Sequence, residues 1–164
     1  MELARRTVLL TGAAGGIGVA TARRLAAAGS RLALVDIDRD RLEALREEIG
    51  EGAIALPADM TDLRQMDDAV AATRDRFGSL SVVVANAAMD AIAPISEIEP
   101  AVFDRVVEVN LMGTFRTVRA ALAAVRDERG HVLIINSARS SRRRSRRRMP
   151  RARRALRPSP TVFV

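Results

Sequence analysis

The residues in this chain that could do chemistry begin at a glycine-rich turn. Residues 11–18 read Thr-Gly-Ala-Ala-Gly-Gly-Ile-Gly and follow a short apolar run. Glycines at this spacing let the backbone approach a pyrophosphate closely, and the next helix would turn its free N–H groups toward the anion. A tight turn that binds nothing is the alternative. The predicted cofactor-binding residues of this turn are Thr11, Gly12, Gly16, Ile17 and Gly18.

A carboxylate follows at a distance that suits a dinucleotide. Asp36 closes the apolar run 32–35, 18 residues beyond Gly18. There it can accept hydrogen bonds from the adenosine ribose hydroxyls, and it would repel a 2′-phosphate. NAD is therefore favoured over NADP as the cofactor, with Arg39 nearby as the one residue that points the other way. Capping of the next helix is the alternative role for Asp36.

The elements that must hold these residues alternate along the chain. Short apolar runs that indicate buried strands recur about every 25 to 30 residues, with amphipathic helical stretches between them. The expected strands are residues 7–11, 32–35, 53–58, 80–84 and 132–135. The expected helices are residues 16–28, a helix ending at Gly50, a helix capped by Thr61 or Asp62, and one long helix ending at Gly130. Because hairpin signals are missing, the order predicts a doubly wound α/β fold with a parallel sheet.

Several motifs together resemble the short-chain dehydrogenase/reductase family. The glycine-rich turn resembles the family's TGxxxGIG motif, and Asp59 matches the aspartate that contacts adenine. Asn86 matches the asparagine of the family's NAG motif, in which Ala88 here replaces the glycine. Asn110 matches the helical asparagine of the proton relay, and Ser137 matches the serine that hydrogen-bonds the substrate oxygen. The resemblance covers residues 5 to 138 of the sequence.

The resemblance implies an oxidoreductase that transfers a hydride between NAD and a small alcohol or carbonyl compound. Ser137 would orient the substrate oxygen, and Asn110 would support the proton relay. Taken alone, Asn110 could instead be satisfied by backbone groups, and Ser137 could cap the end of a strand. The family's long helix is a common subunit contact, so the resemblance also allows a homo-oligomer.

The chain departs from the family where the acid–base pair should stand. The family has a tyrosine 13 residues after the serine and a lysine four residues later; those positions are Pro150 and Arg154. No tyrosine, lysine or cysteine occurs in the sequence, and His131, expected at the surface, is the single histidine. A metal site of several histidines or cysteines is therefore excluded, which leaves only oxygen ligands such as carboxylates as an option, and no metal site is predicted. Losing a positioned acid–base group costs about 10² to 10⁴ in rate, so weak or no turnover is expected.

Charge divides the chain into two parts. Residues 1–138, expected to form one NAD(P)-binding domain, carry 16 arginines and all 20 acids, whereas the arginine-rich tail (residues 139–164) carries 11 arginines and no acid. The tail is either a disordered arm that contacts nucleic acid non-specifically through phosphates or the product of a frameshift after Ser137. In a shifted frame, codons 148–149 can spell tyrosine and codons 152–153 can spell lysine. The frameshift is the favoured hypothesis.

The hydropathy pattern also predicts the cellular location of the protein and an exposed strand at one edge of the sheet. No apolar run approaches the roughly 18 to 20 residues that cross a bilayer, so a soluble cytoplasmic protein without membrane contacts is expected. Since the strand at 132–135 is the last one expected, it should form an exposed apolar edge of the sheet.

Overall fold

The structure is a computed structural model that describes residues 3–136. Its centre is one sheet of five parallel strands in the order β3-β2-β1-β4-β5. The strands are β1 (Thr7–Thr11), β2 (Arg31–Asp36), β3 (Ala53–Pro57), β4 (Val82–Ala85) and β5 (His131–Ile134). The order runs outward from β1 in both directions, which confirms the predicted doubly wound α/β fold.

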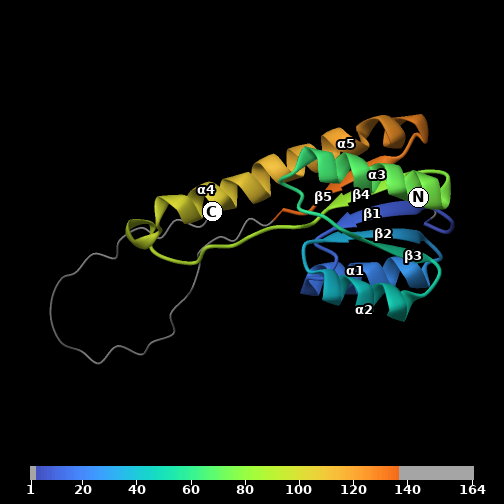
Figure 1. Ribbon diagram of the computed structural model, residues 1–164, viewed down its shortest axis with the longest axis horizontal. Helices are drawn as coiled ribbons and strands as arrows, with labels where there is room; N and C mark the ends of the chain where they lie inside the picture. Colours follow the sequence, from blue (N-terminus) through green and yellow to red (C-terminus); the bar gives the residue numbers. More distant parts are fainter. Residues whose placement is uncertain (1–2, 137–164) are drawn as a thin grey trace, which may run out of the picture.

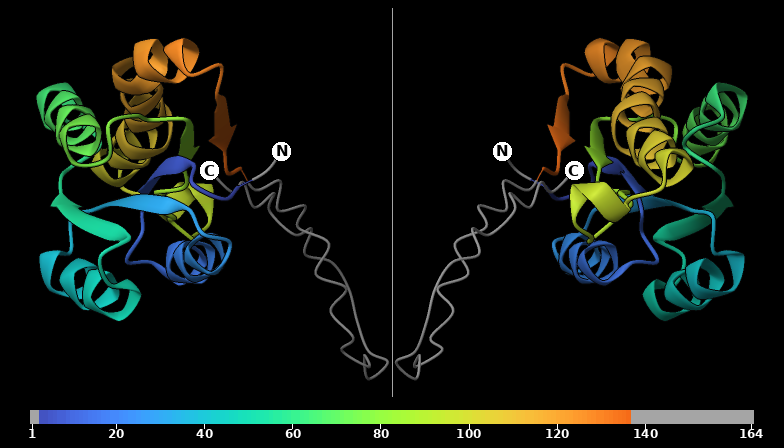
Figure 2. Two further views of the ribbon diagram at one scale, coloured as in Figure 1. Left: turned by 90° about the vertical axis from the view of Figure 1, so that its right-hand side faces the viewer. Right: turned by 90° about the vertical axis from the view of Figure 1, so that its left-hand side faces the viewer.

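Helices cover both faces of the sheet because its strands are apolar on both faces. The helices α1 (Gly16–Ala27) and α2 (Arg39–Ile49) lie on one face, and α3 (Leu63–Phe77) and α5 (Thr114–Asp127) lie on the other (Figures 1 and 2). In β1, Val8 and Leu10 pack toward the first pair, whereas Leu9 packs toward the second. This alternation is the period of two that a strand imposes.

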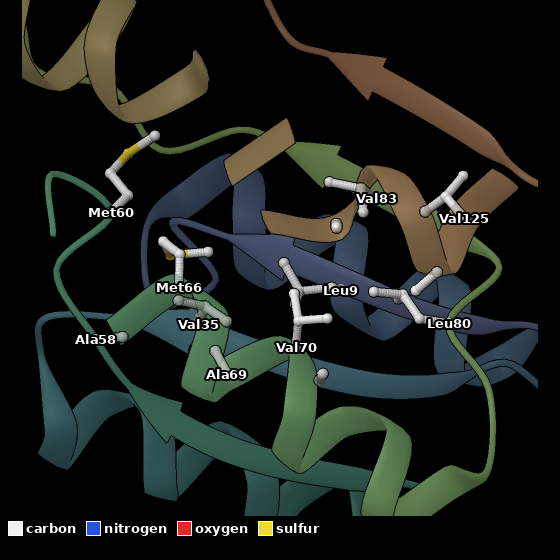
Figure 3. Packing of buried hydrophobic residues seen from close by; sticks show 13 residues of the cluster. Leu9, Val35, Ala58, Met60, Met66, Ala69, Val70, Leu80, Val83 and Val125 are labelled. Atoms are coloured by element: carbon white, nitrogen blue, oxygen red, sulfur yellow. The ribbon is translucent and has the colours of Figure 1, made fainter. Parts of the chain in front are cut away.

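The core between the sheet and the second helix pair is the larger of the two. Figure 3 shows Leu9 and Val83 of the sheet near Val70 of α3 and Val125 of α5. Leu9 and Val83 are fully buried. Such a two-sided core fixes where each parallel strand ends, and therefore fixes the loops at the carboxyl edge of the sheet.

Local signals explain the helix boundaries. Asp62, one of the two caps expected for α3, accepts hydrogen bonds from the backbone N–H groups of the first turn, at 2.9 Å from Arg64 and 3.3 Å from Gln65. Gly78 ends α3 in the left-handed conformation that glycine tolerates best. Asp38 caps α2 in the same way by accepting from the Arg41 N–H at 3.1 Å.

The expected long helix is continuous but not uniformly α-helical. It consists of α4 (Pro100–Val107), a π-helical segment η2 (Glu108–Gly113) and α5. A short 3₁₀ turn, η1 (Ile95–Glu97), precedes α4. The predicted long helix is present, and its centre, where Asn110 lies, is π-helical. Such π-bulges are rare and are frequent at functional sites.

The bounds of four strands also differ from the sequence prediction by one or two residues. β2 is one residue longer at each end, β3 ends one residue early, and β4 and β5 are shifted along the chain. β4 begins at Val82 instead of residue 80, although Leu80 is fully buried, because Leu80 packs into the core before the strand pairing begins. β5 begins one residue early, at His131, which is exposed as expected. Among residues 3–136, β5 lies at the predicted edge of the sheet, and Leu133 and Ile134 are both more than half exposed.

Candidate functional site

The candidate site lies where the chain reverses its direction of winding. β1 and β4 are neighbours, yet β1 leads toward β2 and β3 on one side while β4 leads toward β5 on the other. In such sheets, ligands bind in the crevice beyond the carboxyl ends of the strands at this switch point. A pocket of about 510 Å³ opens there, within the size range of ligand sites. Its lining includes Thr11, Gly12, Gly15, Asp36, Ile37, Asp59, Met60, Asn86, Met89, Arg105 and Val109.

The three glycines of the turn stand in different structural surroundings. Gly12 has a φ of +66°, and a Cβ there would stand 2.7 Å from the Ala87 Cα. A Cβ on Gly18 would overlap the Gly12 carbonyl oxygen, so Gly18 permits the close contact between turn and helix. By contrast, a Cβ on Gly16 would meet no atom within 4 Å. The backbone at Gly16 is therefore open to an approaching group.

Thr11 and Asn86 join the ends of β1 and β4. The Thr11 hydroxyl accepts hydrogen bonds from the Asn86 N–H at 3.1 Å and the Ala87 N–H at 3.2 Å. The Asn86 Nδ2 donates to the carbonyls of Thr11 at 3.0 Å and Gly12 at 3.1 Å. Asn86 thus holds the glycine-rich turn against the neighbouring loop. Ala88, where the family has glycine, is not among the described non-glycine residues with positive φ, so its backbone accommodates alanine.

Asp36 connects the second strand to the glycine-rich turn. Its Oδ2 accepts a hydrogen bond from the Ala14 N–H at 2.9 Å, and its Oδ1 accepts one from the Asp38 N–H at 3.1 Å. The cap of α2 is Asp38, so Asp36 does not have the capping role considered as its alternative. A carboxylate offers about four acceptor positions, which leaves two of them for ribose hydroxyls.

Asp59 lies in the loop after β3 and forms an ion pair across the pocket. Its Oδ1 accepts hydrogen bonds from the Thr61 N–H at 2.8 Å and the Thr61 hydroxyl at 2.7 Å. Its Oδ2 stands 3.2 Å from Nη2 of Arg105 on α4. Burial acts to raise the pKa of Asp59, but the bonds from Thr61 and the Arg105 guanidinium outweigh it, so the pKa lies below its ordinary value.

Asn110 anchors the π-helical segment to the loop after β4. Its Oδ1 accepts from the Met89 N–H at 2.8 Å, and its Nδ2 donates to the Met89 carbonyl at 2.9 Å. Backbone groups therefore satisfy the hydrogen-bonding atoms of the side chain, which is the alternative that the sequence left open for Asn110. The role in a proton relay that the family resemblance implies for Asn110 stays a prediction.

The structure brings most of the predicted residues together. Thr11, Gly12, Asp36, Asp59 and Asn86 line one pocket, and Asn110 hydrogen-bonds Met89 of the same lining. Gly16, Ile17 and Gly18 begin α1 beside it, with the Ile17 side chain 65% exposed. Ser137 lies outside the described residues, as do Pro150, Arg154 and the arginine-rich tail.

Ten residues of the pocket lining were not predicted as site residues, and four of them show why. Gly15 escaped because Gly16 beside it fitted the motif, and Ile37 and Met60 each directly follow a predicted aspartate. Arg105 gave no local signal, because it is brought to Asp59 by the fold alone. Within residues 3–136, no group of acids and histidines could hold a metal ion, and no helix is long and apolar enough to cross a membrane.

The residues present fit a dinucleotide. The open backbone at Gly16 and the start of α1 suit a pyrophosphate, and the two remaining acceptor positions on Asp36 suit a ribose. The lining also contains the apolar side chains of Val35, Ile37, Met60 and Val109 and the carboxylate of Asp59, which suits a flat base with a hydrogen-bond donor.

Comparison with known proteins agrees with this geometry. A family model described as short chain dehydrogenase matches residues 6–148. Sorbitol dehydrogenase from Cereibacter sphaeroides is 38% identical over 144 residues, which are 87% of this chain and 56% of that protein. Galactitol 2-dehydrogenase from Agrobacterium fabrum is 38% identical over 120 residues, 73% of this chain and 47% of that protein.

Solved structures give the same result. The crystal structure of 3-ketoacyl-(acyl-carrier-protein) reductase from Brucella melitensis, complexed with NADH, matches with a TM-score of 0.77 and 30% identity. The match covers 80% of this chain and 57% of that one. The chain thus spans about half the length of the relatives it matches. Because the family model covers most of the sequence, the chain belongs to the short-chain dehydrogenase/reductase family of NAD(P)-binding oxidoreductases.

Proposed function

We propose that this chain binds NAD at the switch-point pocket and derives from an oxidoreductase of small alcohols or carbonyl compounds. The observation that carries the proposal is the convergence of the glycine-rich turn, Asp36 and Asp59 on one pocket. NAD, bound there, supplies or accepts the hydride, which carries two electrons and one proton. Asp36 would accept hydrogen bonds from the ribose and disfavour a 2′-phosphate, so NAD is preferred over NADP.

The side chains divide the remaining work. The Thr11 and Asn86 bonds hold the phosphate-binding turn in place, and the Asn110 anchor holds the loop after β4 beside the pocket. Ser137 would orient the substrate oxygen. A proton must then move to or from that oxygen, and the family's tyrosine and lysine are replaced by Pro150 and Arg154. Neither replacement suits proton transfer, because proline has no acidic proton and arginine has a pKa above about 12.

The proposed activity is therefore impaired in this chain. We expect dinucleotide binding with weak or no turnover, since a missing acid–base group costs about 10² to 10⁴ in rate. The test is a titration of the full chain with NADH and NADPH, followed by the nicotinamide fluorescence, beside an assay of alcohol oxidation. Binding of NADH without turnover supports the proposal. Failure to bind either dinucleotide contradicts it.

A second candidate function rests on the 11 arginines and no acids of residues 139–164. In that case the chain is a non-catalytic dinucleotide-binding domain with a basic arm for nucleic acid. Phosphate-dominated binding weakens steeply with salt, so oligonucleotide titrations at low and high salt would reveal it. Sequencing the coding DNA from codon 130 onward, in three frames, tests the frameshift hypothesis. The domain boundary near residue 138, the cytoplasmic location and a homo-oligomer stay predictions.

A further inference from the structure

Arg105 is the one cation among the described residues that line the pocket. It lies near the end of α4, and its guanidinium contacts two side chains of the loop after β3. Nη2 donates to Asp59 Oδ2 at 3.2 Å, and Nη1 lies 3.4 Å from the Thr61 hydroxyl oxygen. The guanidinium therefore spans both residues, and a fixed fork of donors holds a carboxylate in one orientation.

The contact joins two parts of the fold that have few other ties. α4 extends past the carboxyl ends of the strands (Figure 1), and Val106 is its one buried residue. Val109, one turn after Arg105, lines the same pocket. The ion pair to Asp59 thus draws this helix against the cofactor-binding edge. Arg105 of α4 and Val109 of η2 are thereby part of the pocket lining.

The hydrogen bonds of Asp59 leave one oxygen partly free. Oδ1 already accepts two hydrogen bonds, both from Thr61. Oδ2 accepts one, from Arg105, and so retains one acceptor position. Around it, Ile37, Met60 and Val109 make the pocket apolar. A carboxylate oxygen at the edge of an apolar slot selects a flat base that carries an N–H donor and disfavours a carbonyl oxygen.

We propose that Arg105 is a positioning residue for recognition of the base: it turns Asp59 so that Oδ2 meets the exocyclic amine of adenine. The inference rests on the proposed dinucleotide binding and adds to it the residue that sets base preference. Arg105 acts through Asp59 and α4. Loss of Arg105 should therefore reduce the ratio of affinities for different bases, while the free energy of unfolding should change little.

The test compares two dinucleotides whose bases differ at the six-position edge of the purine. Reduced nicotinamide hypoxanthine dinucleotide has a carbonyl oxygen where NADH has the exocyclic amine, and an N–H where adenine has the N1 acceptor. Both are titrated against the full chain and the variants Arg105→Met, Arg105→Gln and Arg105→Lys, with nicotinamide fluorescence as the signal. Arg119→Met is the matched control, because Arg119 is exposed on α5 and lies outside the pocket lining.

The full chain should bind NADH about tenfold more tightly than the hypoxanthine analogue, the size of one hydrogen bond to a charged group. Arg105→Met and Arg105→Gln should reduce that ratio to about twofold, Arg105→Lys should keep most of it, and Arg119→Met should leave it unchanged. Urea unfolding of each variant shows that the fold is retained, which is expected for a half-exposed ion pair.

The outcomes separate this inference from the proposed function. If the full chain prefers NADH and the Arg105 variants keep the same ratio, the role of Arg105 is overturned while dinucleotide binding stands. If the full chain binds both dinucleotides equally, Asp59 does not read the base and the inference falls alone. If the full chain binds neither, the inference and the proposed function fall together.

Discussion

At the scale of the residue, the glycine-rich turn shows that one motif can contain positions of different kinds. Gly12 is required by the fold, since a side chain there would strike Ala87 and would sit at positive φ. Gly16 is not, because the space beside it is open. The sequence motif alone does not distinguish Gly12 from Gly16. Their difference becomes visible only with the neighbouring loop in place.

This difference predicts opposite results for two matched substitutions. Gly12→Ala should lower the free energy of unfolding by about 1–3 kcal/mol, the usual cost of a strained backbone position. Gly16→Ala should leave stability unchanged or slightly raised, but should weaken NADH binding, because the new methyl group fills the space open to the pyrophosphate. Urea unfolding and NADH titration of both variants provide the check. Unchanged NADH affinity in Gly16→Ala would place the pyrophosphate elsewhere.

Asp36 should determine the choice between NAD and NADP. Asp36→Asn keeps only one of the two oxygens that accept backbone hydrogen bonds, and it removes the charge that repels a 2′-phosphate. We expect NADH affinity to fall about tenfold and the preference over NADPH to narrow. Asp38→Asn is the control, because asparagine also caps helices well and Asp38 is outside the pocket lining. Equal effects of the two substitutions would remove Asp36 from cofactor recognition.

The ion pair of Asp59 predicts a pH dependence. Its pKa in the folded chain lies below the ordinary value of 3.8, so its contribution to stability is present above pH 3.8 and is lost as the pH falls through the folded pKa. Asp59→Asn should therefore lower the free energy of unfolding, measured with urea, by a constant small amount, about 1 kcal/mol or less, from pH 7 to pH 5. The difference should narrow only below about pH 4. Narrowing between pH 7 and pH 5 would contradict this assignment.

At the scale of the element, the alternation of apolar runs and helices was sufficient to predict all five strands. The boundaries moved by one or two residues because burial extends beyond strand pairing, as at Leu80. The π-helical segment could not be predicted from periodicity. It coincides with two tertiary contacts, the bonds of Asn110 to Met89 and the close approach of Gly113 to Met60, and neither partner is near in sequence.

The edge position of β5 predicts a contrast between two leucines. Leu34, in the centre of the sheet, is fully buried, whereas Leu133 is 51% exposed. Leu34→Ala should cost about 2–5 kcal/mol of unfolding free energy, and Leu133→Ala much less than that. Leu133→Lys should also reduce self-association, because a charge on an edge strand opposes pairing between chains. Urea unfolding and sedimentation velocity measure the two effects, and equal costs at the two positions would contradict the edge assignment.

At the scale of the whole molecule, the pocket is a consequence of strand order. The sequence placed Gly12, Asp36, Asp59 and Asn86 each after an expected strand, and parallel strands bring such positions to one edge. That part of the site was predictable. Arg105 was not, because its approach depends on how α4 passes over the loop after β3.

The most direct test of the account is a titration of the full chain with NADH at low and at high salt. The account predicts saturable binding with only a modest dependence on salt, because apolar contacts and the Asp36 hydrogen bonds contribute beside the pyrophosphate. Gly16→Ala should weaken that binding. Absence of saturable binding, or binding that disappears at high salt and is unaffected by Gly16→Ala, would contradict a dinucleotide site at the switch point.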